Sequence, residues 1–310
     1  MDKAFFIAVI IGILSRVIMI NLEQRQYPTR PNILLSQLVL AFVAASLGAL
    51  IIPALIERSY TSITFLSLAI EQFRQVRESR RNTLQNLEEQ QLVSRGDAFI
   101  EEIARTYEVR NYMCIVTSFF TMGLYYFLIS EINIGDNISL IISSVSGLTL
   151  ALMLRKFLTR GEISDIADVV EVKISFVDES IMQIGELKGI TNIGLESDRK
   201  RFLEKGIGIE IIPKDNSYKN AGILYDPGQR QTIAYNLYSR LGLLRENNEP
   251  AFVPLIRRNP NKESLVLAFI PIEKDAKKVI EAVKSAPIVS SAKGKYISLN
   301  NYKIKKKGNI

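Results

Sequence analysis

The sequence predicts an α-helical membrane domain of four or five membrane segments, followed by a cytoplasmic domain that mixes α-helices and β-strands. The mean hydropathy of +0.13 is higher than in ordinary soluble proteins, yet 23% of the 310 residues are charged, too many for membrane helices alone. The long apolar stretches end before residue 158, and strand and helix patterns alternate after it. We therefore expect a membrane domain over residues 1–158, a cytoplasmic α/β domain over 160–302 and a basic tail over 303–310.

The first apolar segment covers residues 4–20 and contains one charged residue, Arg16. A cleaved signal peptide needs a basic start and a small-residue cleavage site, and only one basic residue, Lys3, precedes this segment. We interpret the segment as a retained membrane helix. The side chain of Arg16 either reaches the membrane interface or has an interior partner, such as a carboxylate or the carbonyls of a helix end.

Residues 33–56 are an uncharged stretch of 24, long enough to cross a bilayer with some tilt. Small residues four positions apart predict that another helix approaches closely; the pairs are Ala44 with Gly48, Ala45 with Ala49 and, in a later segment, Ser143 with Gly147. Two further apolar segments cover residues 112–129 and 138–154. All of them fit membrane helices.

Residues 59–70 are apolar but number only 12, which is short for a span. A re-entrant or interfacial helix fits this length better, so four and five membrane segments both stay open. The helix then continues into an Arg-rich connection over residues 71–111, which we expect on the cytoplasmic side. The number of spans decides on which side the N-terminus lies.

The distribution of charge predicts the orientation of the membrane domain. Eight Arg lie within residues 57–111, whereas the loop 130–137 carries two acidic residues and no basic one. Because basic loops face the cytoplasm, the acidic loop lies outside and the C-terminal domain inside. We expect a multi-pass protein of the cell membrane with its C-terminal domain in the cytoplasm.

Residues 99–112 form a charged helix that continues into the apolar segment 112–129. Glu101 and Arg105 are four residues apart and favour a helix, and Arg110 is the last charge before the apolar segment. Paired carboxylates for catalysis are the weaker interpretation of its glutamates, and a solvated helix face is the stronger one. We assign a coupling or docking role to Glu101, Arg105, Glu108 and Arg110.

The second half of the C-terminal domain shows a β-α-β-β-α-β order, typical of a ferredoxin-like fold. The expected elements are strand 221–225, helix 228–241, strands 251–256 and 264–270, helix 273–285 and strand 287–290. Before them we expect strand 169–177, helix 196–205, a left-handed Gly206 at its end, and strand 207–212. Right-handed crossovers place both helices of the second half on one face of a four-stranded antiparallel sheet.

The composition excludes several chemistries. The chain has no His and one Cys, so Ser-His-Asp triads, imidazole catalysis and Cys/His metal sites are ruled out. A protease of this composition would need Lys or a terminal amine as its base, and no spacing singles one out. The sequence therefore leaves open whether the protein is an enzyme, and we expect no metal and no cofactor. A basic domain tethered to a membrane fits anionic lipid better than nucleic acid.

The strongest candidate binding site is the turn 226–231. Asp226 can cap a helix that begins at Pro227, and Gly228 leaves its backbone N–H uncovered. With Gln229, Arg230 and Gln231 in the first turns, this helix start could bind an anion or a peptide carboxylate. The alternative is an ordinary strand-to-helix turn. A weaker candidate of the same kind is the turn at Asn192 and Gly194.

The hexapeptide FIEEIA at residues 99–104 resembles the motif that names the YIEGIA family of endospore-forming Firmicutes. Phe99 stands where the family has Tyr, and Glu102 where it has Gly. The resemblance continues to Tyr112 and, in the same order along the chain, includes residues 25–28, 53–56, 64–68, 72–77, 192–196 and 228–231. It therefore covers nearly the whole chain.

The resemblance implies a polytopic membrane protein of sporulating cells. It also implies a part in the regulated proteolysis of a cytoplasmic sporulation or coat-related protein, under the control of a small soluble capping partner. An alternative is a non-enzymatic membrane scaffold or sensor whose ferredoxin-like domain binds a ligand or protein. A small-solute transporter ranks last, since few ionisable groups lie within the spans. The substrate and a homo-oligomeric state stay open.

Overall fold

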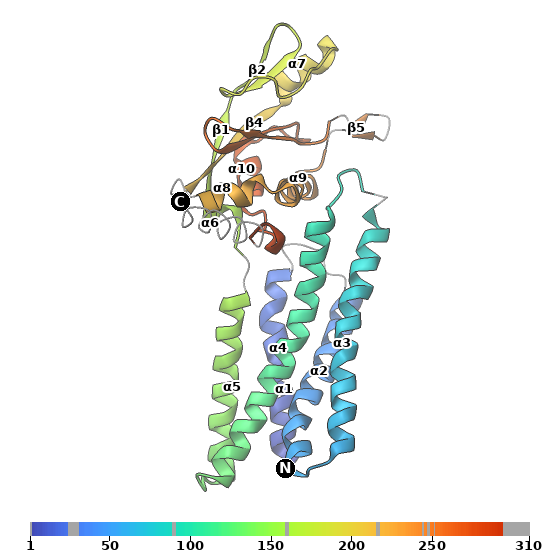
Figure 1. Ribbon diagram of the computed structural model, residues 1–310, viewed down its shortest axis with the longest axis vertical. Helices are drawn as coiled ribbons and strands as arrows, with labels where there is room; N and C mark the ends of the chain where they lie inside the picture. Colours follow the sequence, from blue (N-terminus) through green and yellow to red (C-terminus); the bar gives the residue numbers. More distant parts are fainter. Residues whose placement is uncertain are drawn as a thin grey trace, which may run out of the picture. The chain divides into compact units, whose positions relative to one another are not determined.

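The structure, a computed structural model, describes residues 2–23, 31–88, 91–158, 161–214, 218–243, 245–246, 249–250 and 252–293. The chain divides into two compact units (Figure 1). The helical unit consists of residues 1–82 and 103–159, and the α/β unit of residues 83–102 and 160–310. Residues 83–102, which belong to the predicted connection 71–111, thus group with the α/β unit. The predicted tail 303–310 lies outside the described residues.

Five long helices occur in the first 158 residues: α1 (Asp2–Glu23), α2 (Pro31–Ile56), α3 (Tyr60–Asn86), α4 (Asp97–Ser130) and α5 (Asp136–Leu158). Among the described residues, three are long and apolar enough to cross a membrane, namely α2 over Leu35–Ile56, α4 and α5. A tight turn at residues 57–59 joins α2 to α3, so these two helices run antiparallel (Figure 1). The ambiguous segment 59–70 is therefore the first half of a longer helix.

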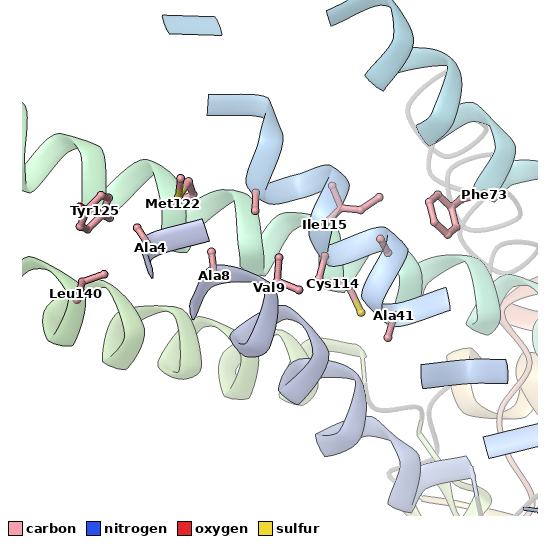
Figure 2. Packing of buried hydrophobic residues seen from close by; sticks show 13 residues of the cluster. Ala4, Ala8, Val9, Ala41, Phe73, Cys114, Ile115, Met122, Tyr125 and Leu140 are labelled. Carbon is pink, nitrogen blue, oxygen red and sulfur yellow. The ribbon is translucent and has the colours of Figure 1, made fainter. Parts of the chain in front are cut away.

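Small side chains make up much of the core of the helical unit. Ala41, Ala44, Ala45 and Ala49 of α2 are fully buried, and Figure 2 shows side chains of α1, α2, α4 and α5 gathered in this core. A Cβ atom added at Gly48 would lie 2.3 Å from the carbonyl oxygen of Ile115, and one at Gly147 would lie 2.1 Å from Thr121 Oγ1. Both glycines of the predicted small-residue pairs thus let α4 approach closely.

The α/β unit is organised around a four-stranded antiparallel sheet of order β1-β4-β8-β7. Its strands are β1 (Ala167–Val172), β4 (Ile207–Pro213), β7 (Leu255–Asn259) and β8 (Ser264–Phe269). Two hairpins, β2 (Ile174–Val177) with β3 (Ile181–Ile184) and β5 (Arg245–Glu246) with β6 (Glu249–Pro250), stand beside it. The helices are α6 (Ile163–Ile166), α7 (Glu196–Lys205), α8 (Tyr218–Tyr225), α9 (Pro227–Leu241) and α10 (Ala276–Lys284).

The sheet is covered on both faces, and every residue of β8 is buried. Helices α8, α9 and α10 lie on one face, and the β2–β3 hairpin and α7 on the other (Figure 1). On the hairpin face, Val266 and Ala268 of β8 pack in one cluster with Phe202 of α7. Strands buried on both faces have continuous apolar runs rather than an alternating pattern, as in this strand.

An α/β domain with an antiparallel sheet is confirmed, but the predicted ferredoxin-like order over its second half is wrong. Residues 221–225 are the end of α8, and in 287–290 only Pro287 forms an isolated bridge, to Glu162. The sheet takes β1 and β4 from the first half of the domain instead. Short apolar runs such as the one in α8 do not distinguish a strand from a buried helix.

Other element boundaries also differ from the predictions. The strand expected over 169–177 is divided at Lys173 into β1 and β2, and the strand expected over 251–256 begins only at Leu255. Helix α7 ends as predicted, but Gly206 has φ −68° and is not left-handed. A Cβ atom there would lie 2.3 Å from the carbonyl oxygen of Phe202, so the glycine provides room rather than a positive φ.

The close approach at Gly48 leads to a stability prediction. We expect Gly48→Ala to lower the free energy of unfolding of the full chain by about 1–3 kcal/mol, because the added methyl group overpacks α2 against α4. Thermal unfolding in detergent micelles measures the change. The control is Gly135→Ala, since no atom lies within 4 Å of a Cβ at that position. Equal melting temperatures for the two variants would refute the contact.

Candidate functional site

The first turns of α4 pack on α9 within the α/β unit. Phe99 is 5% exposed, and its ring centre lies 5.8 Å from that of Tyr235 on α9. Ile100 beside it is also buried. We call residues 94–102 the docking segment. The FIEEIA hexapeptide begins within this segment, and its first residues are buried against the domain rather than exposed.

Polar contacts hold the beginning of the docking segment. Gln231 Nε2 donates hydrogen bonds to the carbonyl oxygen of Ser94 at 2.6 Å and to its Oγ at 3.1 Å. Arg95 Nε donates to the hydroxyl oxygen of Tyr235 at 3.0 Å, and the guanidinium lies 5.2 Å from the ring centre of the same tyrosine. The predicted binding residue Gln231 thus binds a segment of its own chain.

Glu102 holds the other end of the docking segment. Its side chain is buried, and its Oε2 accepts a hydrogen bond of 3.0 Å from the backbone N–H of Ser290. A buried carboxylate needs such partners to offset the loss of water. The predicted solvated helix face is therefore wrong for Glu102. The carboxylate that stands in place of the family's glycine ties α4 to the chain after α10.

The turn 226–231 has the predicted local geometry. Asp226 Oδ1 accepts a hydrogen bond of 3.1 Å from the backbone N–H of Gln229, and Pro227 is the first residue of α9. A Cβ atom at Gly228 would lie 2.5 Å from the Cβ of Ala98. The bare backbone of Gly228 therefore makes room for the docking segment, a contact that the sequence did not reveal.

Gln229 is completely buried and fastens α9 to the chain after α10. Its Nε2 donates to the carbonyl oxygen of Pro287, and its Oε1 accepts from the backbone N–H of Val289, both at 2.9 Å. One amide side chain thus satisfies one acceptor and one donor of the backbone. These contacts give Gln229 a structural role, beside the binding role that the sequence suggests.

Arg230 belongs to a group of three arginines, which we call the arginine group (Arg230, Arg257 and Arg258). Burial lowers the pKa of Arg230 below its ordinary value, and the positive charges of Arg258 and Arg257 lower it further. The guanidinium of Arg258 lies 4.0 Å from the ring centre of Tyr225. Both arginines of β7 are exposed. The start of α9 and the end of β7 therefore form one positively charged surface, suited to an anionic partner.

The sequence pattern did not identify Arg257 and Arg258 as site residues. The pairing of two adjacent arginines is the only signal in the sequence. Their importance depends on β7 lying beside the start of α9, which is a property of the sheet order. No local pattern contains that order.

The second predicted site, at Asn192 and Gly194, lines a cavity of about 430 Å³. The lining residues are Thr191, Asn192, Ile193, Gly194, Leu195, Asp198, Phe252 and Leu255. Arg199 Nη1 donates to the carbonyl oxygens of Ile193 at 3.0 Å and Gly194 at 2.5 Å, which fixes the loop. Because Leu255 is the first residue of β7, this cavity and the arginine group lie along the same strand.

The remaining predicted residues lie on α1 and α4. Glu108 accepts hydrogen bonds from Arg77 Nη1 and from the hydroxyl of Tyr112, both at 3.2 Å. Glu101 is half-buried and Arg105 is exposed. Arg16 and Arg110 are both buried. The side chain of Arg16 therefore does not reach solvent, and the interior partner that the sequence allows for it stays a prediction.

An apolar cavity of about 740 Å³ lies among the helices of the helical unit. Its lining residues are Phe5, Phe6, Leu50, Pro53, Ala54, Glu57, Thr61, Ser62, Phe65, Leu66 and Met122. Several of the rings around it are exposed, including those of Phe6 and Phe65. Exposed apolar side chains on helices of this composition fit contact with lipid tails.

Three described helices are long and apolar enough to cross a membrane, and an α/β unit follows them, which is consistent with a membrane-associated protein. The chain matches the YIEGIA protein family over residues 4–299, and it belongs to that family. It is 32% identical over 290 residues to the uncharacterized protein YphB of Bacillus subtilis (strain 168), covering 92% of this chain and 91% of that protein. No solved structure matches the chain.

The two hydrogen bonds of Gln229 predict a large effect on stability. We expect Gln229→Leu to lower the free energy of unfolding by about 2–4 kcal/mol, because two buried backbone groups lose their partners. Thermal unfolding of the full chain measures it. As a control, Gln183→Leu removes one hydrogen bond from a half-buried side chain and should cost about 1 kcal/mol. A Gln229 variant as stable as this control would contradict the assignment.

The contact of Gly228 with Ala98 predicts how the docking segment responds to a methyl group. We expect Gly228→Ala to speed hydrogen exchange of residues 94–102 about tenfold, since the segment opens locally while the domain stays folded. Hydrogen-exchange mass spectrometry of the full chain measures the rate. Gly194→Ala is the matched control, because its Cβ would meet no atom within 4 Å. Unchanged exchange in the Gly228 variant would show that this contact does not hold the segment.

Proposed function

We propose that this protein is a multi-pass membrane protein whose α/β domain lies in the cytoplasm and binds an acidic, extended segment of a partner protein. Through this binding it takes part in the regulated proteolysis of a sporulation or coat-related protein, under the control of a small capping partner. The role in sporulation rests on the family resemblance. The binding role rests on the charged edge strand of the domain.

The observation that carries the proposal is strand β7. It is an edge of the sheet in the described part of the chain, so its outer backbone groups can pair with an added strand. Arg257 and Arg258 follow each other on this strand and point to opposite faces of the sheet. An added strand would therefore find a positive charge on each side. Acidic residues on that strand complement both arginines, and Arg230 adds a third charge.

Binding of a partner at the arginine group can affect the docking segment, because both involve the first turns of α9. The docking segment contacts Gly228, two residues before Arg230, and Gln231, the residue after Arg230. A partner bound at the arginine group therefore contacts the same part of α9. The docking segment is also the beginning of α4, the helix that continues into an apolar span. We propose that partner binding changes the stability of the docking segment, and that the capping partner competes for this surface.

An adaptor accounts for the geometry better than a peptidase does. Ser264 and Glu210 form a hydroxyl–carboxylate pair in the α/β unit, with their Oγ and Oε1 atoms 2.6 Å apart. Ser264 is fully buried and Glu210 is 7% exposed, so a peptide cannot reach them without unfolding of the sheet. The pair fits a structural bond between β4 and β8.

Charge reversal on β7 tests the proposal. We expect Arg257→Glu with Arg258→Glu to weaken binding of a fluorescent decaglutamate peptide to the full chain about tenfold or more, measured by fluorescence anisotropy at low salt. Added salt should weaken the wild-type interaction as well. The control, Lys200→Glu, reverses an exposed charge on α7 that pairs with Glu196, and it should bind like the wild type.

A peptide that binds the double variant and the control equally well would refute the site. The enzyme alternative has its own test in sporulating cells. If a single Ser, Lys or Asp substitution abolishes loss of the substrate while the protein stays folded and the arginine-group variant still supports it, the protein is a peptidase and the adaptor role is wrong.

A further inference from the structure

The guanidinium of Arg16 is the least compensated charge in the described part of the helical unit. The side chain is 1% exposed, and among the described residues its Nε, Nη1 and Nη2 have no hydrogen-bond partner. The ionisable groups that act on its charge are Cys114, Tyr107 and Arg80. None of these is a carboxylate. A buried cation without a counter-charge is strongly unfavourable, so this geometry calls for an anionic group in addition to those that the described residues place beside Arg16.

Two further arginines converge on the same tyrosine. The guanidinium carbon of Arg80 lies 5.0 Å, and that of Arg110 6.0 Å, from the ring centre of Tyr107. Arg16, Arg80 and Arg110 come from three different helices, α1, α3 and α4. We call these residues the Tyr107 cluster. The carboxylate of Glu108, the residue after Tyr107, is hydrogen-bonded to Arg77 and Tyr112.

The positions of the cluster residues along their helices indicate which anionic ligands can reach the Tyr107 cluster. Arg16 precedes the end of the apolar stretch 4–20, and Arg110 is the last charge before the apolar stretch 112–129. Both positions correspond to the end of a membrane span, where lipid headgroups meet water. The basic sequence around Arg80 and Arg110 assigns this end to the cytoplasmic side, where anionic lipids gather.

We propose that the Tyr107 cluster is a phosphate-binding site, whose ligand is a phosphate group of an anionic phospholipid or a phosphate ion from the cytoplasm. Phosphate presents several oxygen atoms to the paired N–H groups of a guanidinium, and arginine is the preferred residue for such recognition. The ligand supplies the negative charge that Arg16 lacks. The site is built from residues of the helical unit, and the proposal does not depend on the function proposed above.

Ligand-dependent stabilisation of the full chain tests the proposal. Delipidated protein in neutral detergent is titrated with inorganic phosphate, and the same protein is reconstituted into phosphatidylcholine nanodiscs with and without phosphatidylglycerol. We expect phosphatidylglycerol or phosphate to raise the melting temperature of the wild type by about 4 °C. Arg16→Leu should lose this response. Without any ligand it should be at least as stable as the wild type, because a buried charge has been removed.

Two more variants provide a second test of the cluster and a control. Arg80→Gln changes a half-buried residue of α3, and it should weaken the response about tenfold in ligand concentration. Arg74→Gln is the matched control on α3, where an exposed arginine pairs with Glu71, and it should respond like the wild type. A response to phosphate alone, or to phosphatidylglycerol alone, identifies the source of the phosphate. No stabilisation of the wild type by either ligand, or an undiminished response in both cluster variants, would overturn the proposal.

Discussion

The burial of the first turn of α4 against α9 is the contact on which the organisation of this protein depends. It needs a glycine, because a side chain at Gly228 would collide with Ala98. Once the backbones are this close, Phe99 reaches Tyr235, and Gln231 reaches the backbone of Ser94. A helix that carries an apolar span therefore begins as part of the α/β unit. The hexapeptide that marks the family lies at this beginning, so its apolar residues serve packing rather than catalysis.

Sequence patterns predicted those parts of the fold that follow from local physics. Long uncharged stretches, the small residues at Gly48 and Gly147, and the capped start of α9 at Asp226 all have the expected structure. The ferredoxin-like order failed because the apolar run in α8 is too short to show its period. The sheet instead includes β1 and β4, which lie far from β7 in the sequence. Pairings between such distant strands leave no local signature.

The candidate site was predictable in its residues but only partly in their roles. The turn 226–231 stood out for its anion-binding chemistry, and Arg230 does lie in a positive surface. Gln229 and Gln231, however, satisfy backbone groups of the same chain. An amide side chain looks the same in a sequence whether its partner is a ligand or a neighbouring loop. Arg257 was overlooked for the converse reason, since its neighbours are set by the sheet.

The packing of Phe99 on Tyr235 offers the most direct measurement of whether the family hexapeptide is part of the domain. A double-mutant cycle with Phe99→Leu, Tyr235→Leu and the pair, followed by thermal unfolding of the full chain, isolates the interaction between the two rings. We expect a coupling free energy of about 0.5–1.5 kcal/mol between Phe99 and Tyr235. Additive effects of the two substitutions, with no coupling, would contradict it, because the start of α4 would then not be docked on α9.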